Sequence, residues 1–233
     1  MLVASMSAAE PADQNELSTR ETRLVIHNYA TCVVKQHPLK ASEAIQRNVG
    51  NAAMMRDYPK LFDGDCLTRS PFEALEARFS GDLYRYAIAD ALVRRDLADF
   101  TQNDFENLPR LDHRDPGRPP SEIDEKGKKR SGKNFKAAID GYNQSEAFSF
   151  LSRYGECVAR VNPAAAQALL LTKPDSAEEA TRFKALVPAF GTCLPEGQTL
   201  SFGKVTLRGT IAVNYYRLAT AARAAAATTG TAG

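Results

Sequence analysis

The sequence of 233 residues contains no tryptophan, only three histidines and only four cysteines. It has no strong excess of one charge either, because 30 basic and 28 acidic residues leave a formal net charge of +2. So small a charge gives no field that would steer a polyanion to the surface, and we expect no nucleic-acid partner. No apolar run approaches the roughly 20 residues that span a bilayer, so we expect no transmembrane segment.

The short motifs that mark many enzymes and cofactor sites are also missing. Gly-rich phosphate-binding strings, a nucleophile elbow and the paired histidines of zinc enzymes do not occur. The histidines His27, His37 and His113 are isolated from one another, which favours surface or capping roles over a metal site or a general base. Asp63 and Asp65 flank a glycine but lack the other ligands of a calcium loop, so a turn is predicted there. We therefore expect no cofactor and no metal.

The cysteines belong to a pattern that occurs twice. Residues 29–34, YATCVV, return as residues 154–159, YGECVA, and each copy is followed by a second cysteine at a similar distance. A glycine follows each second cysteine, again at a similar distance, with an apolar residue two places further on. Three landmarks in one order predict two sequence-related units.

The spacing of the cysteines decides between their possible roles. Structural zinc needs paired ligands about two to four residues apart, and redox or haem sites need Cys-x-x-Cys, neither of which is present. Three pairings are possible for four cysteines. The pairing that explains why each copy carries its own pair is Cys32 with Cys66 and Cys157 with Cys193. The alternative is four reduced cysteines packed as small hydrophobic residues in a cytosolic protein.

Disulfides indicate an oxidising compartment, so we expect a periplasmic or secreted protein. The first residues add a further indication, because Ser7 and Ala9 suit the cleavage subsites of a signal peptide. The basic region and most of the apolar region of such a signal are missing. The alternative is a chance resemblance, since small residues are common at chain termini.

Apolar periodicity and helix-end signals predict an all-α protein with two tandem, sequence-related units of four to five helices, each with one internal disulfide. We divide the chain into a flexible N-terminus with a possible signal-peptide remnant, helical unit 1, a charged Pro/Gly-rich linker or loop, helical unit 2 and a frayed C-terminus. These are residues 1–17, 18–102, 103–133, 134–227 and 228–233.

Particular end signals place the helices. The capping-box pattern STRE at residues 18–21 begins a helix that His37-Pro38 ends, and a similar pattern at residues 70–73 begins a helix that runs to about residue 98. Long helices are also expected at about 135–161 and 204–226. The segments that carry the second cysteines are predicted as loops because each contains a proline, and these are residues 59–66 and 188–193.

Matched tyrosines and neighbouring arginines are candidates for a binding surface, since aromatic and Arg side chains are enriched at interfaces. The candidates are Tyr29, Tyr154, Arg85, Arg208 and Tyr215. The alternative is that they pack between helices, with the tyrosine hydroxyls reaching hydrogen-bond partners. If a groove exists, the junction of the two units is the natural place for it.

We therefore expect a non-enzymatic binding or scaffold protein that uses helical surfaces or the inter-unit groove. Its partner would be a protein, a small molecule or an envelope ligand. The alternative is a helical hydrolase of an envelope polymer, with acid/base chemistry from Glu21, Asp63, Glu146 or Glu156. Two carboxylates about 5 to 10 Å apart across a deep cleft would favour the hydrolase.

Overall fold

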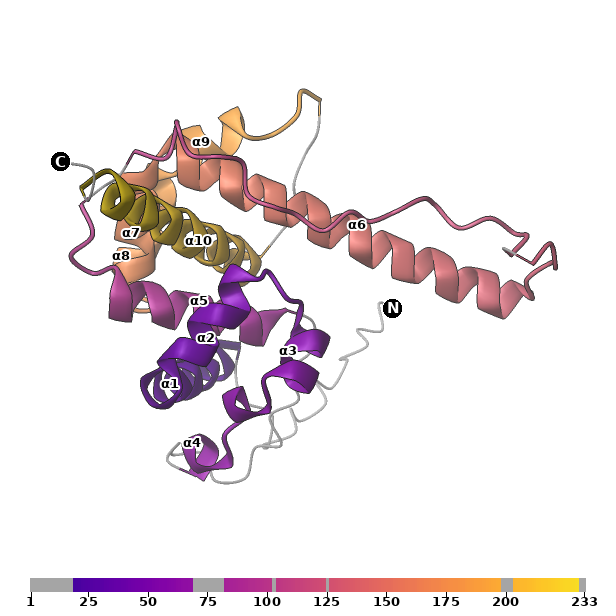
Figure 1. The fold of residues 1–233 in the computed structure, drawn as a ribbon, viewed down its shortest axis with the longest axis horizontal. Helices are drawn as coiled ribbons and strands as arrows, with labels where there is room; N and C mark the ends of the chain where they lie inside the picture. Colours follow the sequence, from indigo (N-terminus) through magenta and orange to yellow (C-terminus); the bar gives the residue numbers. More distant parts are fainter. Residues whose placement is uncertain (1–18, 69–81, 102–103, 125, 198–202, 231–233) are drawn as a thin grey trace, which may run out of the picture.

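The computed structural model describes residues 19–68, 82–101, 104–124, 126–197 and 203–230 (Figure 1). Over these ranges the protein is all-helical, and its only β-type pairing is an isolated bridge between Ile123 and Lys129. None of the helices in these ranges combines the length and the apolar character that crossing a membrane requires.

The first half of the chain is a run of mostly short helices. They are α1 (Thr19–Gln36), α2 (Pro38–Gln46), α3 (Asn51–Asp57), the 3₁₀ helix η1 (Pro59–Leu61), α4 (Gly64–Thr68) and α5 (Leu83–Asp96). The predicted end of α1 at Gln36, just before His37 and Pro38, is confirmed. Pro38 begins α2, where a missing backbone amide costs no hydrogen bond. The predicted helix start at residue 70 lies outside the described residues.

The described residues of the second half form two long helices and three short ones. They are α6 (Gly132–Val161), α7 (Pro163–Leu171), α8 (Ala177–Ala185), α9 (Val187–Thr192) and α10 (Lys204–Gly230). The side chains of Ser131, Asn162 and Ser176 each accept a hydrogen bond from an amide in the first turn of α6, α7 and α8. The last helix continues to Gly230, beyond the predicted end near residue 226.

The two segments predicted as loops are instead helical. η1 and α4 occupy most of residues 59–66, and α9 covers almost all of residues 188–193. The prolines had suggested breaks, but Pro59 and Pro188 stand in the first turns of η1 and α9. Proline is tolerated there because the first amides of a helix have no intrahelical partner.

The two halves share one interior. α10 packs along α5 and α6, and α5 also packs along α1 (Figure 1). The buried apolar side chains form a single cluster that takes members from α1 and α2 as well as from α6, α7 and α10. Helices of both predicted units therefore contribute to one core.

Two glycines allow α10 to approach its neighbours closely. A Cβ atom on Gly209 of α10 would lie 2.2 Å from Cγ of Tyr86 in α5. A Cβ atom on Gly155 of α6 would lie 2.6 Å from the carbonyl oxygen of Thr210 in α10. Only glycine fits at these contacts, so the two residues set the spacing of the central helices.

Both predicted disulfides are confirmed. Cys32 pairs with Cys66 and Cys157 with Cys193, with Cα atoms 5.8 and 5.7 Å apart. The matched tyrosines make matching hydrogen bonds nearby. The hydroxyl of Tyr29 donates to the Asp63 carbonyl at 3.2 Å, and that of Tyr154 to the Phe190 carbonyl at 3.1 Å. Each of these carbonyls lies three residues before the second cysteine. These bonds agree with the duplication, which itself stays a prediction.

The segment between the predicted units folds back along α6 (Figure 1). Phe105 is buried in the shared core, and Arg160 of α6 donates to the carbonyls of Phe105, Leu108 and Pro109. The first part of the predicted linker therefore packs on the body instead of separating two domains. The rest runs beside the N-terminal half of α6, and together they form a projection that we call the arm.

Candidate functional site

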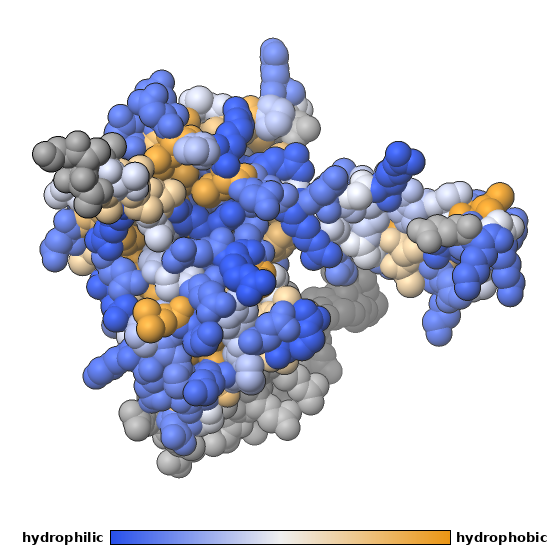
Figure 2. Space-filling view, viewed as in Figure 1, coloured by the Kyte–Doolittle hydropathy of each residue, from blue (hydrophilic) through white to orange (hydrophobic). Residues whose placement is uncertain are grey.

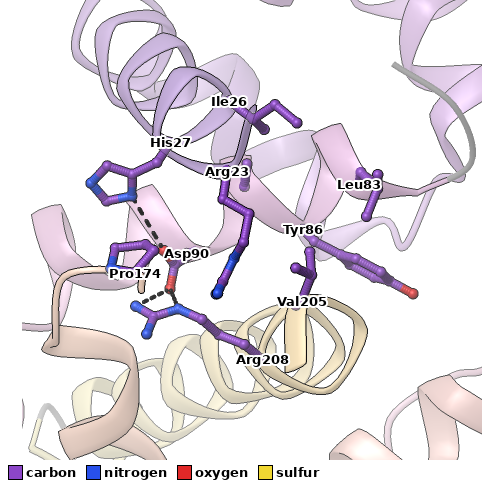
Figure 3. Close-up of a pocket in the computed structure, with 11 residues that line it drawn as sticks. Arg23, Ile26, His27, Leu83, Tyr86, Asp90, Pro174, Val205 and Arg208 are labelled. Atoms are coloured by element: carbon purple, nitrogen blue, oxygen red, sulfur yellow. Dashed lines mark hydrogen bonds and ion pairs between the residues drawn. The ribbon is translucent and has the colours of Figure 1, made fainter. Parts of the chain in front are cut away.

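Three cavities of the described chain differ greatly in size. The junction cavity, among α1, α5, α10 and the α7–α8 connection, has a volume of about 60 Å³ (Figure 3). A cavity beside the second disulfide measures about 450 Å³, and a groove between α3 and α6 about 590 Å³. Sites for small molecules typically measure roughly 300 to 1,000 Å³. The junction cavity has room for a few water molecules and no more.

Arg208 of α10 is the centre of the junction cavity. Its Nε donates to Asp90 Oδ1 at 3.0 Å, and its Nη1 to Glu179 Oε1 at 3.0 Å. The same guanidinium donates to the carbonyls of Leu169, Leu170 and Thr172, at the C-terminal end of α7. All three of its nitrogens are bonded, and its positive charge faces the negative end of the α7 dipole.

Further ion pairs extend from Arg208 to α1. Arg23 donates to Asp175 at 2.7 Å and to Glu179 at 2.9 Å, while Arg94 donates to Asp90. Together with Arg208, these residues form what we call the junction network. Its three arginines are balanced by three carboxylates. Such a balanced network joins α1, α5, α8 and α10 and leaves no charged group available for a ligand.

Asp90 lies between His27 and Arg208 in this network (Figure 3). Burial by itself would raise the pKa of the Asp90 carboxyl, but Arg208, His27 and Arg94 outweigh burial and lower the pKa to about 2. His27 Nδ1 is 3.8 Å from Asp90 Oδ2 and 3.1 Å from Arg94 Nη2. His27 is thus held within the network instead of facing solvent, and the cavity beside it is too small for a substrate.

The cavity beside the second disulfide contains Tyr154, Cys157 and Cys193 in its wall. Its two charged residues are engaged on α6. Arg153 donates to the hydroxyl and carbonyl oxygens of Ser149, and Glu146 accepts from the hydroxyl of Tyr142. These charges therefore have partners on their own helix.

The α3–α6 groove is where the two predicted units and the linker meet. Met55 and Arg56 come from α3, Ser145 and Phe148 from α6, and Arg114 from the linker. In Figure 1, α3 lies on the side of the body that faces the arm, and Figure 2 shows the arm extending from the body in the same view. This groove occupies the inter-unit position at which the sequence favoured a binding site.

Phe148 connects the groove to a buried cation. The guanidinium carbon of Arg85 lies 5.2 Å from the centroid of the Phe148 ring, a cation–π contact. Arg85 is only 2% exposed, and its Nη2 donates to Asn48 Oδ1. Burial lowers the pKa of the Arg85 guanidinium. A second buried arginine, Arg217 of α10, lies close by.

Arg217 is linked to Arg85 through one amide and one carbonyl. Arg217 Nη2 donates to the carbonyl oxygen of Asp112 at 2.8 Å, and Asn48 Nδ2 donates to the same oxygen at 3.2 Å. Burial, together with the charge of Arg85, lowers the pKa of Arg217 to about 10. We call Arg85 and Arg217 the arginine pair. Their positive charges repel each other in a site with little water to screen them.

The structure does not gather the five candidate residues in one place. Tyr29 and Tyr154 pack inside with their hydroxyls bonded to carbonyls, and Tyr215 is buried with its ring edge-on to Phe105 at 5.5 Å. Arg208 belongs to the junction network, and Arg85 lies behind the groove. Sequence reasoning missed Phe148 and Arg114. Phe148 and Arg114 could have been found only by knowing that α3 and α6 lie next to each other. That arrangement depends on tertiary packing and leaves no local pattern in the sequence.

The carboxylates proposed for hydrolysis are also dispersed. Asp63 binds His37 at 3.2 Å, and Glu156 binds His113, Arg160 and the Leu111 amide. Among the described residues, each cavity is lined by a single carboxylate: Asp90, Asp82 or Glu146. No cluster of three or more His, Cys, Asp or Glu side chains in the described ranges is arranged to hold a metal ion.

Comparisons with known proteins gave no match among protein-family models, curated proteins or solved structures. Function is therefore inferred from the geometry of the site itself.

Proposed function

We propose that the protein is a non-enzymatic binding protein whose ligand occupies the α3–α6 groove. The observation that carries the proposal is a groove of about 590 Å³ at the meeting point of both halves, with a desolvated arginine behind its wall. Its volume is within the range typical of small-molecule sites. Of the three cavities, this one alone combines ligand size with contact to a buried cation.

The lining of the groove favours an amphipathic, negatively charged ligand. Met55 and Phe148 offer apolar contact, Ser145 offers a hydroxyl, and Arg56 and Arg114 bring positive charge. Part of the Arg56 charge is already used, because Arg56 Nε binds Asp57 at 2.7 Å. Asp82 is the single carboxylate of the described lining. A paired acid and base is the usual requirement of glycoside hydrolysis, so the lining supports binding in preference to turnover.

The two disulfides are consistent with an oxidising compartment. We propose that this compartment is the periplasm or the cell exterior. The ligand would then be a small molecule or an envelope component that is present there.

The test is native mass spectrometry of the protein purified from its own host. Ser145→Trp places an indole in the groove, whereas Asn143→Trp places the same indole on an exposed position of α6 outside the groove lining. We expect a non-covalent adduct on the wild type and on Asn143→Trp, and its loss from Ser145→Trp. Retention of the adduct by Ser145→Trp, or no adduct on any of the three proteins, would contradict the proposal.

A further inference from the structure

Buried Arg208 and part-buried Arg160 have carboxylate partners. Arg208 binds Asp90 and Glu179, and Arg160 binds Glu156 at 2.7 Å. Within the described residues, Arg85 and Arg217 form no ion pair, and their hydrogen-bond partners are neutral oxygens. A buried charge without a counter-charge is costly, because the desolvation of the ion is not offset. The arginine pair therefore differs in kind from the junction network.

Unpaired buried polar atoms gather on the same two helices. Four buried side-chain atoms in the described chain have no hydrogen-bond partner, and three of them are Arg85 Nε, Asn214 Oδ1 and Arg217 Nη1. Arg85 lies on α5, and the other two residues lie one turn apart on α10. In most native structures such groups are bonded. The two arginine atoms are donors and lack an acceptor, whereas Asn214 Oδ1 is an acceptor and lacks a donor.

Asp82 acts electrostatically on Arg85, and Glu156 and Asp112 act on Arg217, but none of these carboxylates forms an ion pair with either arginine. Glu156 is already committed to Arg160, His113 and the Leu111 amide. Asp112 is exposed and reaches Arg217 with its backbone carbonyl. Asp82 lines the groove and forms no ion pair with either arginine within the described residues. The pair thus keeps a net positive charge and two unused donors, Arg85 Nε and Arg217 Nη1.

We propose that Arg85 and Arg217 form a subsite for a doubly charged oxyanion, a phosphate or sulfate group, behind the Phe148 side of the α3–α6 groove. This inference rests on the proposed function and names the chemistry of the ligand's charged end. Two guanidinium groups match the charge of a dianion, and their N–H donors match its oxygens. Phe148 stands between the groove and Arg85, so its side chain moves aside when the anion enters.

The test compares thermal unfolding of the full chain in sodium phosphate, sodium sulfate and sodium chloride at equal ionic strength. At about one hundred times Kd, phosphate or sulfate should raise the wild-type Tm by roughly 5 to 11 °C over chloride. Arg217→Gln should lose this rise while keeping, in chloride, a Tm at least equal to that of the wild type, since it removes an uncompensated charge. Arg182→Gln, at an exposed arginine of α8, should keep the full rise.

Isothermal titration with inorganic phosphate gives a second measurement on the same proteins, and we expect binding by the wild type and at least tenfold weaker binding by Arg217→Gln. Glycerol 3-phosphate distinguishes the source of the oxyanion. Tighter binding of the ester assigns the subsite to the charged end of a larger groove ligand, and equal or weaker binding assigns it to the free anion. Either order supports the subsite.

Equal wild-type Tm values in the three salts, without phosphate binding in the titration, would overturn the inference and leave an ordered water as the partner. A lower Tm of Arg217→Gln in chloride, with an unchanged rise in phosphate, would also overturn it, because Arg217 would then be structural only. These failures differ from failure of the groove. Loss of the host-derived adduct from Ser145→Trp would support the groove. Retention of the same adduct by Arg217→Gln would show that the ligand does not use the anion subsite.

Discussion

Glu178 and Glu179 are neighbours in α8 with opposite surroundings. The Glu179 side chain is 3% exposed and binds both Arg23 and Arg208, whereas that of Glu178 is 62% exposed and binds Arg182 at 3.5 Å. We expect Glu179→Gln to lower the free energy of unfolding by about 3 kcal/mol, because buried Arg208 and part-buried Arg23 each lose one of their two carboxylate partners. Glu178→Gln should change it by less than about 0.5 kcal/mol. Urea unfolding measures both, and equal effects would refute a stabilising role for the junction network.

The lowered pKa of Glu156 makes the stability of the protein depend on pH. Burial alone would raise the pKa of its carboxyl, but hydrogen bonds from His113, the Leu111 amide and Arg160 lower the pKa to about 2. A carboxyl with a lowered pKa in the folded state stabilises the protein above its unfolded pKa, and this contribution is lost as pH falls from about 5 to about 2. We expect Glu156→Gln to be less stable than the wild type by about 2 kcal/mol at pH 7.

The difference between Glu156→Gln and the wild type should shrink steadily as the pH falls toward 2. Asp90 has a similarly lowered pKa and is present in both proteins. Its contribution to the pH dependence therefore cancels when the two free energies of unfolding are subtracted. Urea unfolding at several pH values measures the difference. A gap that stays constant over this pH range would show that Glu156 does not act through its charge.

Whether an arginine is paired depends on neighbours that are distant in the sequence. Arg85 and Arg208 both lie on tyrosine-rich helices, and the sequence predicted the same binding role for both. The structure gives Arg208 acids from α5 and α8, whereas Arg85 contacts an asparagine and an aromatic ring. The sequence thus identified arginines of interest but held no information on the long-range contacts that separate a structural arginine from an unpaired one.

Two glycines of α6 test the close packing of the long helices. Gly155 touches Thr210 of α10, whereas a Cβ atom on Gly141 would meet nothing within 4 Å. We expect Gly155→Ala to lower the free energy of unfolding by roughly 2 to 3 kcal/mol, because α6 and α10 must move apart. Gly141→Ala should raise it by about 0.5 to 1 kcal/mol through better helix propensity. Thermal and urea unfolding measure both, and stabilisation by Gly155→Ala would contradict the close contact.

Helix ends could be predicted where local signals agreed. His37 and Pro38 act within a few residues of each other, so α1 ends at Gln36, where the sequence indicated. The segments around Cys66 and Cys193 were mispredicted as loops because a proline fits both a break and the first turn of a helix. The disulfides and the core packing decide between these two states, and neither contributes to a local pattern.

The disulfides tie distant segments of the whole molecule together. Each closes a loop of 34 or 36 residues, which should contribute about 3 to 4 kcal/mol in the chain-entropy model. We expect the double variants Cys32→Ser/Cys66→Ser and Cys157→Ser/Cys193→Ser each to lower the urea midpoint accordingly. Because the halves share one core, each variant should still unfold in a single transition. Two separate transitions would show that the halves are independent.

The position of the groove could be predicted from the sequence better than the residues that line it. The duplicated pattern indicated two units, and their junction was the expected place for a pocket. The side chains around the groove depend on how α10 fits against α5 and α6 at Gly209 and Gly155. That fit arises from contacts between helices that are far apart along the chain. The sequence therefore indicated where to look but not which residues would meet there.

The most direct test of ligand binding in the α3–α6 groove is the electron density of crystals grown from protein purified from its native source. We predict density for a non-protein molecule in contact with Arg114, Ser145 and Phe148, with its anionic group against Arg85 and Arg217. A groove filled by water alone, with the Phe148 ring still packed on Arg85, would contradict the proposed function.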